Sequence, residues 1–344
     1  MIKVLYSAVL LFAGFTSLAH ADAVGVRDFT VPQSEYGRAL STVVWYPAEN
    51  IGKVEIVGEN PAFLGIPAIR NALPDAAAHP LVVLSHGYSG SWRNLSWLAG
   101  ELVTKGYVVA ATDHPGTTTF DRSRTEAAKL WERPRDLSRL IDALLADKEL
   151  GPRIDGKRIA AIGHSLGGWT VAALAGARVD TAQFAADCEA KTSPRACALS
   201  HELGLDSTGE ARKTLEGDLR DPRIGAVVSL DLGLARSFSP ESLAAVTVPM
   251  LIFGAGIDVG GLPADLESGY LAAKLPMATR EYVVVADAMH FSFLQLCKPG
   301  AVELIEERSP GDGVACKDGG TRGRAAIHRE VADRIATFLG ATLP

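Results

Sequence analysis

Six short, nearly continuous apolar runs alternate with helical patterns after residue 80, and this alternation restricts the possible fold more than any other feature of the sequence. The runs are Pro80–Gly87, Gly106–His114, Lys157–Ser165, Arg223–Asp231, Val248–Gly256 and Arg280–Asp287. The helical patterns are Leu95–Lys105, Arg133–Lys148, Gly167–Ala177, Ala264–Leu275 and Ala325–Leu339. Continuous apolar runs fit strands that are buried on both faces, so the alternation predicts a mainly parallel sheet with helices on both faces.

Two segments nearer the N-terminus have a different pattern. Val26–Val31 and Leu40–Tyr46 alternate apolar and polar residues, which is typical of antiparallel strands with one solvated face. The stretch from Ala48 to Pro80 is punctuated by Pro and Gly and predicts a long loop. With the six buried runs, these two strands predict one eight-stranded α/β domain over residues 22–344.

One interval breaks the strand–helix rhythm. Residues 178–221 are too long for an ordinary crossover and contain Cys188, Cys197 and many charged residues. We expect this interval to be an insertion, or lid, that follows the helix beginning near Gly167. We expect it to lie over the carboxyl edge of the sheet, where folds of this kind bind ligands.

The first 21 residues have the pattern of a signal peptide. Lys3 supplies a positive charge, Val4–Leu18 is apolar, and Ala19-His20-Ala21 is a small-x-small cleavage site. No later segment is apolar and long enough to span a bilayer, so we expect no stable membrane insertion and a periplasmic or secreted location.

Four cysteines fit an oxidising compartment, where thiols pair. Nearest-neighbour pairing predicts the disulfides Cys188–Cys197 and Cys297–Cys316, the simplest of three connectivities.

No Cys-x-x-Cys or His-x-x-x-His spacing indicates a metal site, and we expect no metal or cofactor. The formal net charge of −6, without a run of Lys or Arg, argues against nucleic acid as a partner.

The motif Gly163-His164-Ser165-Leu166-Gly167 matches the G-x-S-x-G pattern of a nucleophilic serine. An apolar strand ends at the motif and a helical pattern begins directly after it. In such a turn the serine has a strained backbone, and the flanking glycines relieve crowding. Ser165 is therefore the predicted nucleophile.

A serine hydroxyl needs a base to accept its proton, and in this chain order the base follows the last strand. His290 lies directly after that strand. His328 is the only other late histidine, and its neighbours Arg329 and Glu330 predict a solvated helix face. Asp231 and Asp258 each follow a strand between the serine and the histidine, so either can be the acid that orients the imidazole.

The oxyanion of the reaction needs two backbone N–H donors. One would come from Leu166, directly after the serine. The other would come from Tyr88, in the glycine-containing turn His86–Gly90 after the first buried run. His114 follows another strand, in His114-Pro115-Gly116, and is predicted to line the substrate pocket.

The sequence resembles the bacterial platelet-activating-factor acetylhydrolase and dienelactone-hydrolase-like group of α/β hydrolases. The similar stretches are Val43–Ala48, Leu84–Ser91, Asp113–Gly116, Gly163–Gly168, Leu230–Gly233 and Met289–Cys297. The resemblance implies a metal-independent serine esterase of the α/β-hydrolase fold that prefers short acyl groups and acts on a small-molecule or lipid-like ester. It points to Asp231 as the acid, whereas most other α/β hydrolases place the acid one strand later, which corresponds to Asp258.

Several alternatives remain open at this stage. The chain also resembles, less closely, secreted cutinase-like polyesterases, which share the Gly-His-Ser-x-Gly-Gly turn. A peptidase or a thioesterase would use the same triad. A binding protein on this scaffold would usually lack a triad member, and here each member has a candidate.

Overall fold

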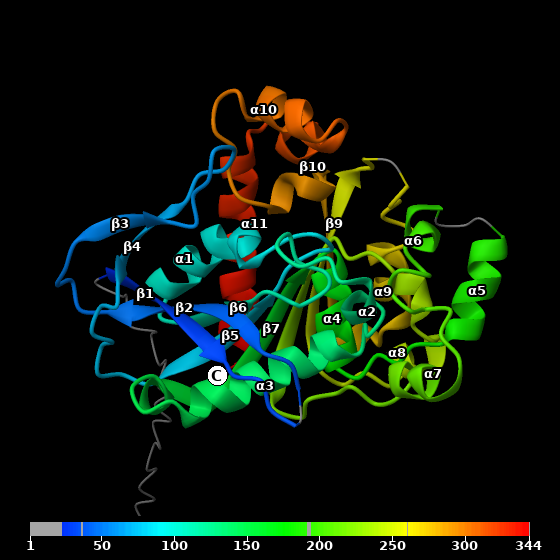
Figure 1. Cartoon of the computed structure of the whole chain (residues 1–344), viewed down its shortest axis with the longest axis horizontal. Coiled ribbons are helices and arrows are strands. Elements are labelled where there is room, and N and C mark those ends of the chain that lie inside the picture. Colours follow the sequence, from blue (N-terminus) through cyan, green and yellow to red (C-terminus); the bar gives the residue numbers. More distant parts are fainter. Residues whose placement is uncertain (1–22, 36, 191–193, 260, 344) are drawn as a thin grey trace, which may run out of the picture.

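A ten-stranded sheet runs through the molecule, and its parallel strands extend from one edge, at β10, inward to β6 (Figure 1). This computed structural model describes residues 23–35, 37–190, 194–259 and 261–343. The predicted signal peptide, residues 1–21, lies outside the described residues. Within those ranges, no helix is both long and apolar enough to cross a bilayer.

The strands follow the order β10-β9-β8-β7-β5-β6-β2-β1-β4-β3 across the sheet. Strands β5 to β10 are mutually parallel, and β2 pairs antiparallel with both β1 and β6. Their bounds are β1 Ala23–Val31, β2 Leu40–Ala48, β3 Val54–Val57, β4 Ile66–Arg70, β5 His79–Ser85, β6 Val108–Thr112, β7 Ile154–His164, β8 Ile224–Leu230, β9 Met250–Ile257 and β10 Arg280–Met289.

The prediction of eight strands is wrong by two. The stretch predicted as a loop contains β3 and β4, which pair antiparallel with each other, and β4 adds to β1. β3 is mostly exposed, and Pro67 lies within β4. A short edge strand buries little apolar surface and tolerates proline, so it lacks the continuous apolar run that revealed the central strands.

Helices cover both faces of the sheet, as predicted. The helices are α1 Ser96–Thr104, α2 Arg124–Ala127, α3 Glu132–Ala146, α4 Leu166–Leu174, α5 Thr181–Glu189, α6 Pro194–Ala198, α7 Gly209–Leu215, α8 Pro240–Ala244, α9 Ser268–Lys274, α10 Ala301–Arg308 and α11 Arg324–Thr342. On one face α3, α4 and α9 pack against the strands, and on the other face α1 and α11 do.

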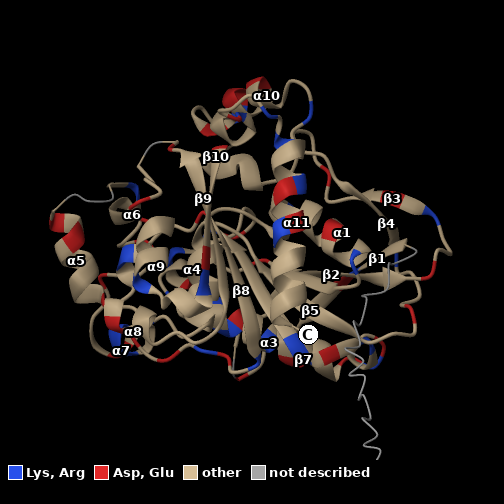
Figure 2. Cartoon of the chain, turned by 180° about the vertical axis from the view of Figure 1, so that it is seen from behind, with Lys and Arg blue, Asp and Glu red and all other residues tan. Residues whose placement is uncertain are grey.

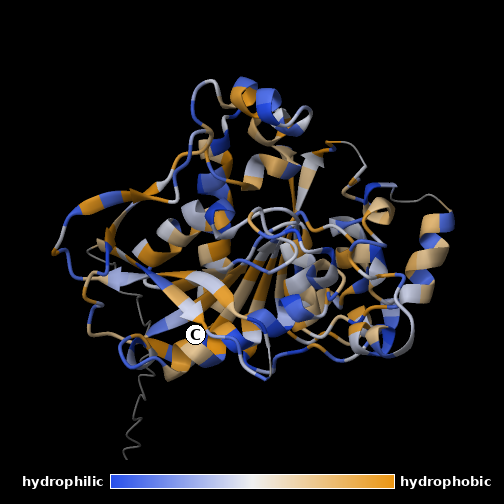
Figure 3. Ribbon diagram, viewed as in Figure 1, coloured by the Kyte–Doolittle hydropathy of each residue, from blue (hydrophilic) through white to orange (hydrophobic). Residues whose placement is uncertain are grey.

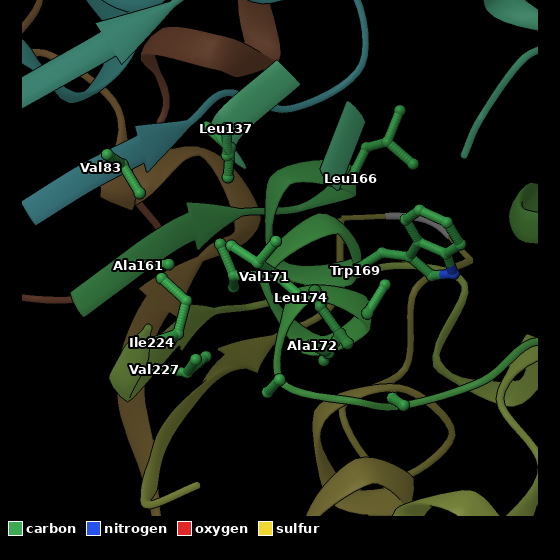
Figure 4. Packing of buried hydrophobic residues seen from close by; sticks show 14 of the residues in the cluster. Val83, Leu137, Ala161, Leu166, Trp169, Val171, Ala172, Leu174, Ile224 and Val227 are labelled. Atoms are coloured by element: carbon green, nitrogen blue, oxygen red, sulfur yellow. The ribbon is translucent and has the colours of Figure 1, made fainter. Parts of the chain in front are cut away.

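The two cores explain why the central strands are apolar along their whole length. Leu137 of α3 and Val171 of α4 pack on Val83 and Val227 of the sheet (Figure 4). Every residue of β5 and β6 is buried. The central strands are accordingly apolar in Figure 3, and the charged residues gather on the outer helices and loops in Figure 2.

Candidate active site

Ser165 occupies the sharp turn between β7 and α4, with φ 54° and ψ −119°. This backbone conformation is strained for a residue with a side chain. A Cβ added to Gly163 would lie 2.0 Å from the carbonyl oxygen of Gly167, and a Cβ on Gly167 would lie 1.9 Å from that of Ser85. Both flanking glycines are therefore required by the close approach of backbone in this turn.

The acid and the base meet at the same edge of the sheet. Asp231 directly follows β8, and His290 directly follows β10. The Nδ1 of His290 lies 2.6 Å from the Oδ2 of Asp231, and both side chains are buried. A carboxylate accepts hydrogen bonds, so in a neutral imidazole this contact favours the tautomer with the proton on Nδ1 and the lone pair on Nε2. A histidine in this tautomer can accept the proton of a serine hydroxyl.

Asp231 is itself held in place by β9. Its second oxygen, Oδ1, accepts the Ala255 N–H at 2.8 Å, and its own N–H donates to the Phe253 carbonyl at 2.9 Å. Like Ser165, it has a positive φ, 45°. The turn after β8 thus fixes the carboxylate by backbone hydrogen bonds on one side and presents it to the imidazole on the other.

The alternative acid, Asp258, is placed differently. It is exposed, and its oxygens accept the N–H groups of Gly261 and Leu262 at 3.2 and 3.1 Å. These are the hydrogen bonds of a carboxylate that caps a turn. The geometry pairs the imidazole with Asp231 rather than with Asp258.

The turn that carries His290, the 3₁₀ segment η5 His290–Phe293, is anchored from behind. The Met289 N–H donates to the Ser292 hydroxyl at 3.0 Å, and that hydroxyl donates to Asp318 at 2.7 Å. Arg324 binds the same carboxylate at 3.1 Å. These polar contacts, together with the disulfide Cys297–Cys316 a few residues further on, restrict the position of the imidazole.

His164, the variable residue of the serine motif, also supports His290. Its Nε2 lies 2.8 Å from the His290 carbonyl oxygen, and the two ring centroids are 4.7 Å apart. Burial lowers the pKa of His164 well below its usual value, and the neighbouring His290 adds to this. His164 is therefore neutral and donates from Nε2. Sequence reasoning missed this role because the pattern leaves that position open.

The predicted oxyanion donors lie beside the serine. Leu166 is the first residue of α4, so its N–H has no acceptor within the helix. Tyr88 lies in the turn after β5, and a Cβ on the adjacent Gly87 would come within 3.1 Å of the Ser165 Cβ. The Tyr88 turn therefore packs directly on the turn that carries Ser165.

A buried guanidinium supports the turn from below. Arg133 of α3 donates to the His86 carbonyl oxygen, to the Ser85 hydroxyl at 3.2 Å and to the Thr117 hydroxyl at 2.6 Å. Burial lowers the pKa of Arg133 to about 9, so the group remains charged at neutral pH. No sequence pattern pointed to this residue, because its partners are distant in sequence.

His114 does not lie where the sequence predicted. Its side chain is fully buried, with Nδ1 2.8 Å from Asp136 and Nε2 3.0 Å from the Ser85 hydroxyl. It is absent from the cavity beside Ser165. The pocket-lining prediction is therefore corrected. His114 belongs to the polar network under the Tyr88 turn, which links it to α3.

Ser165 and His290 line a small cavity of about 90 Å³. Tyr88, Leu166 and Phe291 complete the side formed by the sheet edge. A larger hollow of about 590 Å³, lined by Trp92 and Phe120 among others, contains neither the serine nor the histidine. Because the reacting groups converge on the smaller cavity, we assign the chemistry there.

The opposite wall of the cavity comes from the segment between α4 and β8, which we call the cover (residues 178–221). Its described parts contain α5, α6 and α7, and the disulfide Cys188–Cys197 ties α5 to α6. Arg195, Ala196 and Leu199 line the cavity. In Figure 1 the helices α5 and α6 lie beyond the β10 end of the sheet.

The cover also contacts the Tyr88 turn. The Tyr88 hydroxyl donates to Glu202, and burial together with this carboxylate raises the pKa of Tyr88 to about 12. No group of three or more His, Cys, Asp or Glu side chains arranged to hold a metal occurs in the described part of the chain.

Comparisons with known proteins agree with this architecture. The family model described as serine aminopeptidase, S33, matches residues 76–188. Cutinase est1 of Thermobifida alba is 34% identical over 101 residues, which are 29% of this chain and 31% of that cutinase. Cutinase 1 of Thermobifida cellulosilytica is 29% identical over 132 residues, 38% of this chain and 45% of that protein. The matches thus span less than half of each cutinase.

One solved structure is similar over nearly the whole chain: a ferulic acid esterase from Streptomyces cinnamoneus. The match covers 95% of this chain and 92% of the esterase, with a TM-score of 0.64 and 21% identity. At that identity the likeness shows the fold alone. The mainly parallel sheet, the serine turn between strand and helix and these matches together place the chain in the α/β-hydrolase superfamily.

Proposed function

We propose that the chain is an exported serine esterase that cleaves carboxylic esters through an acyl-enzyme at Ser165. The observation that carries the proposal is the 2.6 Å hydrogen bond between His290 and Asp231, in a cavity that Ser165 also lines. The matched cutinases and the ferulic acid esterase of the same fold act on esters by their names, which supports this class of substrate.

In the proposed reaction, the Ser165 hydroxyl attacks the ester carbonyl carbon while the Nε2 of His290 takes its proton. The N–H groups of Leu166 and Tyr88 stabilise the oxyanion, and Asp231 stabilises the imidazolium. The intermediate collapses, and His290 returns the proton to the departing alcohol. Water then attacks the acyl-serine with His290 again as the base, which releases the acid and restores the serine.

The size of the cavity supports a short acyl group. The cavity of about 90 Å³, bounded by Leu166 and the cover, is small, which favours a short acyl group over a long one. This agrees with the acetylhydrolase-like subgroup, to which the Leu230–Gly233 stretch and its Asp231 point. We further propose that residues 1–21 are a signal peptide and that residues 178–221 act as the substrate-binding insertion. The two disulfides support an oxidising location.

A nitrophenyl ester series from acetate to dodecanoate tests this function on the purified chain. We expect kcat/KM to be highest for the shortest esters and to fall as the acyl chain lengthens. A thioester and an aminoacyl anilide of matched acyl size are the comparison, since the matched family model bears the name of a peptidase. Faster cleavage of the anilide than of the ester would overturn the esterase proposal.

A further inference from the structure

Arg195 brings a positive charge to the wall of the catalytic cavity. It lies on α6 of the cover, its side chain is exposed, and it lines the same cavity as Ser165 and His290. Directly after it, Ala196 is buried and Cys197 is bonded to Cys188, so the helix that carries the guanidinium is anchored at these two residues.

A second contact limits the position of Arg195. A Cβ added to Gly261 would lie 3.3 Å from the Arg195 Cβ, which shows that the loop after β9 packs against α6. This Gly261 has a φ of +93°, a conformation that favours glycine. The start of the Arg195 side chain thus packs against the loop after β9, at the sheet edge, while the rest of the side chain reaches solvent.

No carboxylate of the described residues forms an ion pair with Arg195. Among the described residues, Arg195 forms no hydrogen bond and no ion pair, and none of those lining the cavity is Asp or Glu. By contrast Arg236, also on this side of the molecule, forms a two-pronged pair with Asp187 at 2.7 Å. Most of the remaining cavity wall is apolar, so Arg195 is its one fixed charge in the described structure.

The carboxylates near the cavity already have partners. Asp231 binds His290 and the Ala255 N–H, and Glu202 accepts the Tyr88 hydroxyl. Asp258, in the loop that packs against α6, accepts the N–H groups of Gly261 and Leu262. A guanidinium presents planar, paired N–H donors that match a carboxylate. An anionic group on the substrate would therefore find its counterion at Arg195 and not elsewhere in the cavity.

We infer that Arg195 is a specificity-determining residue that recognises a carboxylate on the substrate. The preferred substrates are then esters with a second, ionised acid group, such as half-esters of dicarboxylic acids or esters of hydroxybenzoic acids. This inference rests on the proposed esterase function, and it names the substrate class of that same site.

Two pairs of substrates test the inference and locate the carboxylate. Monoethyl adipate against diethyl adipate places the anion in the acyl half, and para-acetoxybenzoate against its methyl ester places it in the leaving group. The readout is the ratio of kcat/KM for the anionic ester to that for the neutral ester. Comparing this ratio between variants cancels the intrinsic reactivity of each ester.

For Arg195→Ala we expect the ratio to fall roughly tenfold for at least one pair, the size of a partly exposed charge-assisted hydrogen bond. Arg195→Glu lowers it further, and Arg195→Lys restores part of it. The effect appears mainly in KM and weakens at high salt. Arg220→Glu is the matched control, because Arg220 is an exposed arginine of the cover that does not line the cavity.

A ratio unchanged in both Arg195→Ala and Arg195→Glu would overturn the inference. An equal fall in Arg220→Glu would also overturn it, because the cause would then be the overall field of the protein. Failure of the esterase proposal looks different: the wild-type chain would cleave neither the neutral nor the anionic esters.

Discussion

The two walls of the catalytic cavity are built in different ways. One wall is the sheet edge that carries Ser165, Asp231, His290 and the Tyr88 turn, which we call the frame. The strands behind it are buried on both faces, and its turns are fixed by close backbone packing. The other wall is the cover, made of three short helices, a disulfide and many surface ion pairs.

The different construction of the two walls suits two different tasks, catalysis in the frame and substrate selection in the cover. The reacting groups must keep their geometry within a few tenths of an ångström, and the frame supplies that rigidity. The cover contributes Arg195, Ala196 and Leu199 to the lining of the cavity, and none of the three is a member of the proposed triad. Changes in the frame are therefore expected to alter the rate for every ester, and changes in the cover to alter which ester is preferred.

The largest expected effect separates the two aspartates. Asp231→Asn should lower turnover by about three to four orders of magnitude, because the amide favours the wrong imidazole tautomer. Asp258→Asn should change turnover little, since Asp258 caps a turn outside the frame. Steady-state kinetics on a short-chain ester measures both. A severe loss in Asp258→Asn, with Asp231→Asn nearly active, would show that the histidine pairs differently in solution.

The next effect tests the packing of the frame. Gly167→Ala places a Cβ 1.9 Å from the Ser85 carbonyl oxygen, and since backbone cannot move aside easily we expect a loss of about 3 kcal/mol of unfolding free energy or more. Gly340→Ala is the matched control: that glycine lies in α11 with nothing within 4 Å, so alanine should be neutral or slightly stabilising. Urea unfolding compares the two, and equal stability in both variants would contradict the account of the turn.

The two disulfides provide a direct comparison of the walls. Removal of Cys188–Cys197 by paired serine substitutions should cost about 2.5 kcal/mol in the chain-entropy model, and it should broaden the acyl-chain preference because α6 is released. Removal of Cys297–Cys316 should lower turnover for all chain lengths, since that bridge lies behind His290. The chain-length profile of each variant is the measurement. If both variants showed the same dependence of turnover on acyl-chain length, the frame and the cover would not have the separate tasks that we assign to them.

A pH-dependent effect concerns a buried histidine behind the frame. Burial lowers the pKa of His328 from 6.5 to about 3, so the folded state keeps it neutral. The unfolded chain binds the proton first, and the stability that neutral His328 contributes is complete above pH 6.5 and is lost as pH falls toward 3. His328→Gln should therefore reduce the slope of unfolding free energy against pH by about 1.4 kcal/mol per pH unit between pH 4 and 6. An unchanged slope would mean that His328 is accessible to protons in the folded state.

The frame was largely predictable because its signals are local. The runs that form β5, β6, β8 and β9 are largely apolar, and the serine motif stands between a strand and a helix. The cysteines of both walls pair with their nearest neighbours in sequence. Each of these patterns reflects a constraint that acts over ten to twenty residues of sequence.

The wrong predictions concern side chains whose positions are determined by contacts with residues distant in sequence. His328 was predicted on a solvated face because Arg329 and Glu330 adjoin it, yet it is 5% exposed and stacks on Trp97. In a helix, adjacent residues point in different directions, and His328 shares its face with the buried Val331 and Ile335 rather than with its charged neighbours. His114 was misplaced for a similar reason, since Asp136 and Ser85 hold it from other elements.

Covalent labelling tests the central claim, that His290 and Asp231 activate Ser165, most directly. The wild-type chain, Ser165→Ala and His290→Gln are each treated with a fluorophosphonate at neutral pH, and the labelled peptide is identified by mass spectrometry. If His290 and Asp231 activate Ser165, we expect rapid, stoichiometric labelling of Ser165 in the wild type and none in Ser165→Ala. In His290→Gln we expect labelling slower by orders of magnitude. Labelling of another residue, or equal rates in wild type and His290→Gln, would contradict this claim.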